Sequence, residues 1–314
     1  MRKAEWMSGK YGIMVHYLPS IYSDKDCGKC MTCNEMADNF DVVNFVDEVK
    51  NMGASWIIFP FGQNSGFYWS YNAVIEKYMP NICSKRDLVF EIAVEAKRRG
   101  LKFIAYMPTE VDANTALLRA AFGWDLSADK KVFMERWTEV VRYYALKFGD
   151  LLDGWWLDGC YNSAEKNFCR THDWTNERFD EQKWFEALRA GNENRIAAMC
   201  SGANHMGYVF DSEEYLPGES NDLEKYPWDY DSTQKQWHAL IWLDCFWMHE
   251  KKGKIEPPKF SNKELAAYLK KCFNMKGAVT MNIGIYENGT LAPETVKQIH
   301  NIKGLFKKCH KNRG

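Results

Sequence analysis

Short apolar runs alternate with long amphipathic runs along this chain, and the alternation restricts the fold more than any other feature of the sequence. Apolar runs bounded by turn residues predict strands, and apolar residues spaced by three and four predict helices. The expected strands are 11–17, 55–61, 102–108, 154–159, 195–202, 207–211, 236–246 and 278–285. The expected helices are 39–53, 84–100, 130–149, 179–191, 262–277 and 293–308.

Strands that alternate with helices are expected to be parallel. About eight such units within about 250–300 residues fit a (β/α)8 barrel. The prediction is therefore an α/β protein, a TIM-like barrel that forms a single domain over residues 1–314. A doubly wound sheet is the alternative, but such a sheet usually carries a Gly-rich phosphate loop after its first strand, and none is present.

Composition narrows the classes of partner. The net charge of −1 gives no reason to expect nucleic acid or an anionic membrane surface. The N-terminus "MRKAEWMSGKYG" has no apolar signal region, and no stretch approaches the ~20 apolar residues of a membrane span. As the sequence stands, a cytoplasmic protein is expected, or a secreted or periplasmic one if a signal peptide has been removed.

The segment "LLDGWWLDGCYN" ends a strand-like apolar run on an acid, Asp158. A carboxylate beside two tryptophans is costly to bury and needs a partner or a task. In a (β/α)8 barrel, catalytic groups lie at the carboxyl ends of the strands. Polar residues expected at those ends are His16, Gln63, Asn64, Glu110, Asp158, Asn204, His205, Asp211, Glu213, Glu214 and Asn282.

Two carboxylates at one barrel mouth suit glycoside hydrolysis, in which one attacks the anomeric carbon and the other protonates the leaving oxygen. Asp158, at a rigid strand end, is the expected nucleophile. The proton donor is Glu213 or Glu214 in the loop "FDSEEY". The alternative is that this loop is a surface turn whose acids are merely solvated.

Six segments in order resemble the α-L-fucosidase family of retaining glycoside hydrolases. They are "GKYGIMVHYLP", "GASWIIFPFGQNSGF", "RDLVFEIAVEAKRRGLKFIAYMP", "DGWWLDG", "FDSEEY" and "GAVTMNIGIYENGTLAPETVKQI". The resemblance implies a retaining exo-glycosidase that acts on α-linked terminal sugars without a cofactor. It places the nucleophile at Asp158 and, through the Glu-Tyr pair, the acid/base at Glu214. An oligosaccharide or glycoconjugate is the implied substrate, and the oligomeric state stays open.

Departures from the family pattern bear on the sugar. Gln63 and Asn64 stand where the family has two adjacent histidines, and Met107 stands where it often has a tyrosine. Amides still donate and accept hydrogen bonds, so these changes imply a different hydroxyl pattern. The family's C-terminal β-sandwich is not expected, because the sequence ends after the eighth helix.

Other residues are expected to hold the sugar. The full set of expected substrate-binding residues is His16, Gln63, Asn64, Trp156, Asn204, His205 and Trp228. Trp155 and Trp156 are adjacent on one strand, so only one faces the barrel interior, and Trp156 shares its face with Asp158. A catalytically degenerate protein that binds carbohydrate without cleaving it is the second hypothesis, motivated by the histidine replacements.

The segment "CGKCMTC" places Cys27, Cys30 and Cys33 at intervals of three residues, and Cys83 follows the second strand. Such spacing is compatible with a zinc or iron–sulfur site, with a disulfide or with free thiols. No second CxxC accompanies it, so the expectation is no metal. Metal-assisted hydrolysis is the weakest of the three functional hypotheses.

Overall fold

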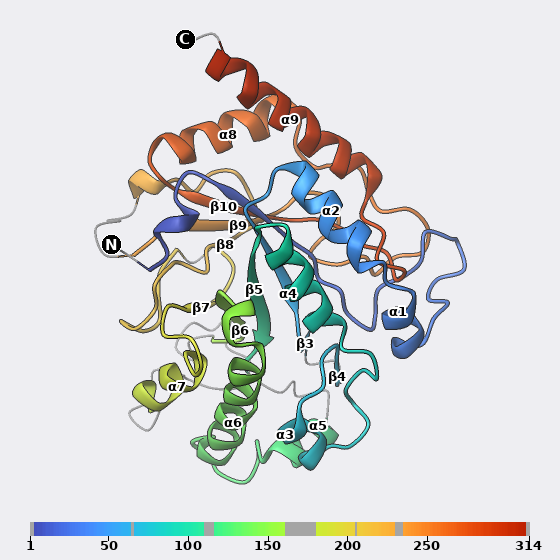
Figure 1. Cartoon of the computed structure of the whole chain (residues 1–314), viewed down its shortest axis with the longest axis vertical. Helices are drawn as coiled ribbons and strands as arrows, with labels where there is room; N and C mark the ends of the chain where they lie inside the picture. The colour runs from blue at the N-terminus through green and yellow to red at the C-terminus, as the bar shows by residue number, and fades with distance from the viewer. Residues whose placement is uncertain are drawn as a thin grey trace.

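The computed structural model describes residues 3–63, 66–109, 116–160, 180–204, 206–229 and 235–311. In this part of the chain, eight strands form one parallel sheet (Figure 1). They are β1 (Tyr11–Met14), β2 (Trp56–Pro60), β5 (Lys102–Pro108), β6 (Gly154–Asp158), β7 (Ile196–Met199), β8 (Glu219–Ser220), β9 (His238–Trp242) and β10 (Ala278–Asn282). A short antiparallel hairpin, β3 (Gly62–Gln63) and β4 (Phe67–Tyr68), follows β2.

The strand order confirms the TIM-like architecture and not the doubly wound alternative. The order is β7-β6-β5-β2-β1-β10-β9-β8, so the first strand pairs with the last. Within the described residues no ladder joins β7 to β8. The chain before β8 lies between β7 and β9 instead, where the Glu214 N–H donates to the Ala197 carbonyl of β7 (3.1 Å) and the Leu216 N–H to the Gln236 carbonyl just before β9 (3.0 Å).

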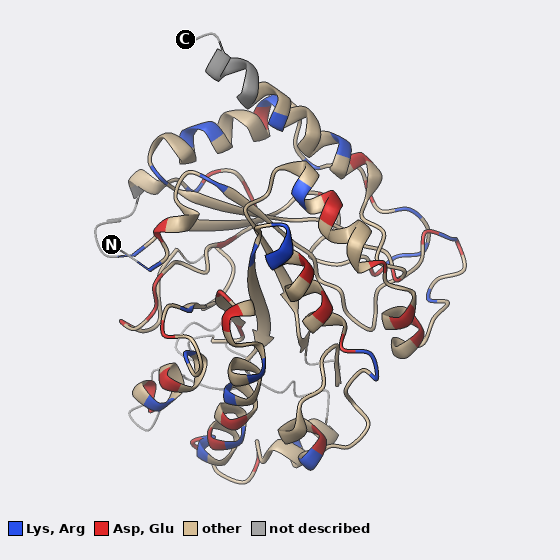
Figure 2. Ribbon diagram, viewed as in Figure 1, with Lys and Arg blue, Asp and Glu red and all other residues tan. Residues whose placement is uncertain are grey.

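Helices cover the outside of the curled sheet (Figure 1). They are α1 (Cys33–Asn39), α2 (Val42–Met52), α3 (Ala73–Tyr78), α4 (Leu88–Arg98), α5 (Ala116–Phe122), α6 (Lys131–Phe148), α7 (Glu181–Leu188), α8 (Asn262–Asn274) and α9 (Pro293–Lys311). Charged residues of both signs lie along these helices (Figure 2). None of the described helices is both long and apolar enough to cross a bilayer.

Local sequence explains where the helices begin and end. The Asp41 side chain accepts the Asn44 N–H at the start of α2, and Gly53 ends this helix in the left-handed conformation. Helix α4 begins later than the sequence predicted, because Asp87 rather than Ser84 caps it by accepting the Phe90 N–H. Short elements such as α1, α3, α5 and the hairpin were not expected, since they carry too few residues for a periodic pattern.

The two tryptophans of β6 point to opposite faces of the sheet, and each belongs to a different layer of the core. The Trp155 ring faces the helices, and its Nε1–H donates to the Leu188 carbonyl (2.9 Å). Trp156 belongs to the inner cluster within the sheet and stacks on Tyr106 with ring centroids 5.5 Å apart. The prediction that Trp156 faces the interior is therefore confirmed.

The predicted strand at 207–211 is wrong. The Glu213 carboxylate accepts the N–H groups of Val209 (2.6 Å) and Phe210 (2.7 Å), so this segment forms a turn and not a ladder. The sixth barrel strand is β8, which pairs with β9 at Leu240 and Ile241.

Candidate active site

Asp158 ends β6 at the carboxyl edge of the sheet, and its carboxylate accepts hydrogen bonds on both oxygens. The Tyr106 hydroxyl donates to Oδ2 (2.6 Å), and the Gln63 side-chain amide lies 3.5 Å from the same atom. The Gly159 N–H donates to Oδ1 (2.9 Å). The Gln63 amide also donates to the Tyr106 hydroxyl. These bonds fix the orientation of the carboxylate.

His16, just after β1, meets the Tyr106 ring edge-on, with ring centroids 5.3 Å apart. Its Nδ1 is 2.7 Å from Asn282 Oδ1, at the end of β10. Because an amide oxygen only accepts, Nδ1 carries the hydrogen and Nε2 is left as an acceptor. Burial lowers the pKa of His16, with the Asn282 bond and nearby Asp158 acting in the opposite direction. The histidine is therefore a neutral polar group in the site.

Trp247 forms an aromatic wall beside His16, with ring centroids 5.7 Å apart. The Trp247 carbonyl accepts the Asn282 Nδ2–H (2.7 Å), which fixes the loop after β9 to β10. Trp247 has a positive φ of 62°. A bulky residue in that region is strained, and such strain is concentrated at functional sites.

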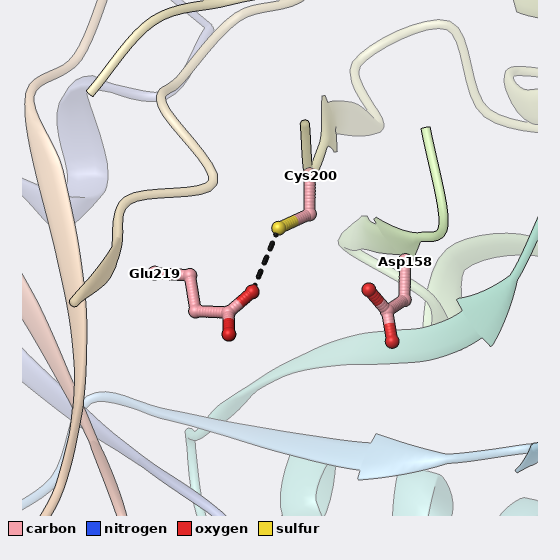
Figure 3. Close-up of side chains that lie close together, drawn as sticks. All are labelled: Asp158, Cys200 and Glu219. Atoms are coloured by element: carbon pink, nitrogen blue, oxygen red, sulfur yellow. Dashed lines mark hydrogen bonds between the residues drawn. The ribbon is translucent and has the colours of Figure 1, made fainter. Parts of the chain in front are cut away.

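Glu219 supplies the second carboxylate, at the start of β8. Oxygen atoms of Asp158 and Glu219 and the sulfur of Cys200 all lie within 4.8 Å of one another (Figure 3). The Cys200 thiol donates to Glu219 Oε2 (3.0 Å). Burial raises the pKa of Glu219 to about 7, and the charge of Asp158 acts in the same direction. A carboxyl group that keeps its proton near neutral pH is suited to proton donation.

The backbone around Gly218 places Glu219. The Gly218 carbonyl accepts the Leu240 N–H (2.7 Å), and the Glu219 carbonyl accepts the Asn204 N–H (2.7 Å). One residue earlier, the Trp156 Nε1–H donates to the Pro217 carbonyl (2.9 Å). Gly218 has φ +65°, and a Cβ there would collide with the His238 carbonyl oxygen. Only glycine allows β8 to approach β9 so closely.

We expect Gly218→Ala to lower the free energy of unfolding by about 2–4 kcal/mol, from backbone strain and steric overlap together. Gly100→Ala is the matched control, because Gly100 has φ +68° and no atom within 4 Å of the added Cβ. It should cost about 1 kcal/mol. Urea unfolding of both variants measures the difference, and equal losses would contradict the steric account.

The structure does not bring the expected acid/base, Glu214, to Asp158. Glu214 Oε2 accepts the Ala197 N–H (2.9 Å), and Oε1 pairs with Arg189 (2.7 Å). Ala197 lies three residues before Cys200, which is about 10 Å along a strand. The Glu214 carboxylate is therefore near the start of β7, whereas Asp158 lies level with its end.

Glu213, the other expected donor, is a buried structural group. Besides the turn that it forms at residues 209–210, it accepts the Met199 N–H (2.7 Å) at the end of β7. Burial raises its pKa to about 8, while these backbone donors oppose the shift. Its carboxylate therefore links the turn at residues 209–210 to the end of β7 through hydrogen bonds.

The remaining expected sugar contacts are distributed as follows. The Asn204 side chain is exposed and accepts the Asn221 N–H (3.2 Å), so this hydrogen bond holds the loop beside Glu219 in place.

Trp228 is exposed and stacks on Tyr226, with ring centroids 4.2 Å apart. Its neighbour Pro227 packs near Gly277, before β10, whereas His16 meets the far end of β10. Trp228 is thus at the opposite edge of the sheet from Asp158. Asn64, His205 and Glu110, which was expected after the third strand, lie outside the described residues.

The four cysteines considered for a metal do not form one group with metal-ligand spacing. Cys27 and Cys30 are exposed, Cys33 is half-buried, Cys83 is buried, and all four are free thiols. The Ser23 hydroxyl lies 3.5 Å from the Cys27 sulfur and 3.6 Å from the Cys30 sulfur. In the described part of the chain, the one group with metal-ligand spacing is Asp158, Cys200 and Glu219. Burial raises the pKa of Cys200 well above its ordinary value, which disfavours the thiolate that zinc would need.

The model of the α-L-fucosidase family matches residues 3–309. The chain belongs to the α-L-fucosidase family. It is a glycoside hydrolase of the fucosidase type, and the site described above is the candidate active site of this family member.

Solved structures of similar fold include fucosidases and fucoidan hydrolases. α-L-Fucosidase AlfC from Lactobacillus casei superposes with a TM-score of 0.68 at 14% identity, over 98% of each chain. AlfC in complex with its α-L-fucose product gives 0.68 at 15% identity, over 98% of this chain and 99% of that one. Endo-fucoidan hydrolase P5AFcnA, of glycoside hydrolase family 107, gives 0.66 at 14%, over 96% and 92%. No curated protein sequence matches. At sequence identities of 14–15%, these similarities show only that the chain shares the fold of these proteins.

Four residues of this family member's site were missed by sequence reasoning: Tyr106, Cys200, Glu219 and Trp247. Tyr106 had a usable signal, because it lies two residues before Pro108 on β5 and thus on the same face, opposite Trp156 in register. Cys200 directly follows β7, at the level of Asp158. Glu219 lies in a strand of only two residues and Trp247 in the loop after β9, and neither segment is long enough or regular enough for a periodic pattern.

Proposed function

We propose that this protein is a retaining exo-glycosidase that removes α-linked terminal fucose or a close stereochemical relative, and that residues 1–314 act as one catalytic unit. Asp158 is the nucleophile, and Glu219 takes the acid/base role that the sequence alone assigned to Glu214. The observation that carries the proposal is the approach of the Asp158 and Glu219 oxygens to within 4.8 Å. Retaining enzymes hold their carboxyl groups about 5–5.5 Å apart, whereas inverting ones need about 6.5–9.5 Å.

In the first step, an Asp158 oxygen bonds to the anomeric carbon as the glycosidic C–O bond breaks. The Glu219 proton passes to the departing oxygen, which leaves Glu219 ionised. In the second step, Glu219 takes a proton from water, and the hydroxyl oxygen attacks the same carbon and releases Asp158. Two inversions give net retention.

The residues around the pair support this assignment of roles. Tyr106 and Gln63 direct hydrogen bonds to Asp158 Oδ2, which orients the carboxylate for attack. Nε2 of His16 and the Trp247 ring offer a polar and an apolar contact for a sugar. AlfC, the fucosidase of similar fold, has been solved with α-L-fucose as product. Trp156 packs behind Tyr106 and forms the floor of the site.

The proposal is tested by product analysis on a panel of nitrophenyl glycosides. We expect release of nitrophenol from α-L-fucoside, with the α-anomer of the sugar appearing first in proton NMR. Fucoidan serves as the second substrate, because endo-fucoidan hydrolases share the fold. Saturable binding without release of nitrophenol would support the carbohydrate-binding alternative, and shortening of fucoidan without nitrophenol release would contradict the exo assignment.

The pKa of Glu219 sets an expected pH dependence. The free enzyme needs Glu219 protonated, so kcat/KM should fall as pH rises through about 7, the folded-state pKa to which burial raises this carboxyl. Below that pH the acid is present in its active form. A pH–rate profile with nitrophenyl α-L-fucoside measures this basic limb, and a rate that stays constant to pH 9 would contradict the assignment.

A further inference from the structure

We propose that Cys200 is a positioning residue whose thiol holds the Glu219 carboxyl in the orientation needed for proton transfer beside Asp158. This inference rests on the proposed function, in which Glu219 is the acid/base. Nothing in the sequence pattern pointed to this cysteine, which reads as a small buried hydrophobe at the end of a strand.

The backbone on both sides of Cys200 is fixed. Its N–H donates to the Leu157 carbonyl (2.7 Å), and its own carbonyl accepts the Cys160 N–H (3.0 Å). The side chain is fully buried and belongs to the inner cluster with Trp156. The sulfur therefore occupies a defined point at the level of Asp158, on the strand next to it.

Figure 3 shows the thiol between the two carboxylates, with its hydrogen bond directed to Glu219. Because Glu219 Oε2 accepts this bond at 3.0 Å, the transferable proton of the acid is left to Oε1. A carboxyl group rotates about its terminal bond with little preference for one angle. One buried donor at a fixed position removes that freedom, and preorganisation of this kind is worth a measurable part of a catalytic barrier.

The thiol acts as a neutral donor and not as a nucleophile. Burial raises the pKa of Cys200 well above its ordinary value, and the charges of Glu219 and Asp158 raise it further. The described titratable groups that act on Glu219 are Asp158 at the end of β6 and Cys200 after β7. On the neighbouring strand β9, His238 is directed to the Leu216 carbonyl and Thr280 instead. Removal of the thiol therefore leaves Glu219 with burial and the charge of Asp158, the two influences that raise its pKa and favour its protonated form.

The test compares Cys200→Ala, which removes the donor, with Cys200→Ser, which keeps one. Each is assayed with two aryl α-L-fucosides, one with a poor leaving group that needs protonation and one with a good leaving group that does not. We expect Cys200→Ala to lower kcat about tenfold on the poor leaving group, with a much smaller change on the good one. Its basic pH limb should move upward, and Cys200→Ser should restore both values.

A purely structural role predicts a different pattern, with equal losses on the two substrates, an unmoved pH limb and no rescue by serine. That result, or a wild-type profile for Cys200→Ala, overturns the inference about Cys200. The proposed function still stands in that case if Glu219→Gln is impaired. If Glu219→Gln keeps wild-type activity, the acid/base assignment fails and the role of Cys200 falls with it. Thermal unfolding of both cysteine variants reports any loss of folded protein.

Discussion

Replacing Asp158 with alanine or asparagine should lower kcat on nitrophenyl α-L-fucoside by about 10⁴-fold or more, the size of effect seen when an attacking group is removed. Neither replacement can form the bond to the anomeric carbon, although asparagine keeps the shape and can still meet Tyr106. Initial rates on purified, folded variants give the measurement. Asp150→Asn is the control, because Asp150 is an exposed aspartate before β6, at the other end of the barrel. It should keep the wild-type rate.

Azide provides the second arm of this experiment. In Asp158→Gly the removed side chain leaves room on the face from which the carboxylate attacks. Azide should enter there, restore turnover of an activated fucoside and yield a fucosyl azide of inverted configuration. An alanine variant that retained the full rate, or an azide product of retained configuration, would contradict the role of Asp158.

Glu219→Gln should lower kcat by about 10²–10⁴-fold on substrates with poor leaving groups, the usual contribution of a general acid. The loss should be much smaller for a dinitrophenyl leaving group, because that departs without protonation. The basic limb of the pH profile should disappear as well, because the titrating group is gone. Rates on the two substrates, measured from pH 5 to 9, separate this pattern from simple misfolding.

Glu214→Gln is the matched control for Glu219→Gln, because it makes the same chemical change five residues away. It weakens the bonds to Arg189 and to the Ala197 N–H, so stability should fall by about 1–2 kcal/mol. Its kcat and leaving-group dependence should be those of the wild type. The opposite outcome, with Glu214→Gln impaired and Glu219→Gln normal, would return the acid/base role to the residue that the sequence pattern indicated.

Regular elements were predictable because their periodicity is imposed by burial. Strand β5 spans Lys102–Pro108, as expected, and β6 ends on Asp158 one residue before the expected limit. Two site residues at strand ends, Asp158 and His16, could therefore be placed from the sequence alone. Both follow continuous apolar runs, which are typical of strands covered on both faces.

The second acid was harder to place because β8 has only two residues and no apolar run. Its position depends on tertiary contacts: Gly218 allows close approach to β9, and the Trp156 ring holds the Pro217 carbonyl. The Glu-Tyr pair of the family motif pointed to Glu214 instead. In the structure the adjacent Tyr215 donates to the Trp155 carbonyl (2.7 Å), near the middle of β6. Glu214 and Tyr215 therefore lie nearer to the amino ends of the strands than Asp158 does.

Some aromatic residues of the site were equally hard to place from the sequence. Composition and motif position favoured Trp228, yet this ring stacks on Tyr226 beside α8. Trp247 contacts His16 and has a positive φ, and no local sequence pattern indicated either feature.

The most direct measurement is to trap the sugar–enzyme bond. A fucosyl fluoride with fluorine at the 2-position destabilises both transition states, and its good leaving group lets the covalent intermediate accumulate. Mass spectrometry of the digested protein should then show one added 2-fluorofucosyl group, on the peptide that contains Asp158. A label on any other residue, or inactivation that leaves every peptide unmodified, would contradict the account.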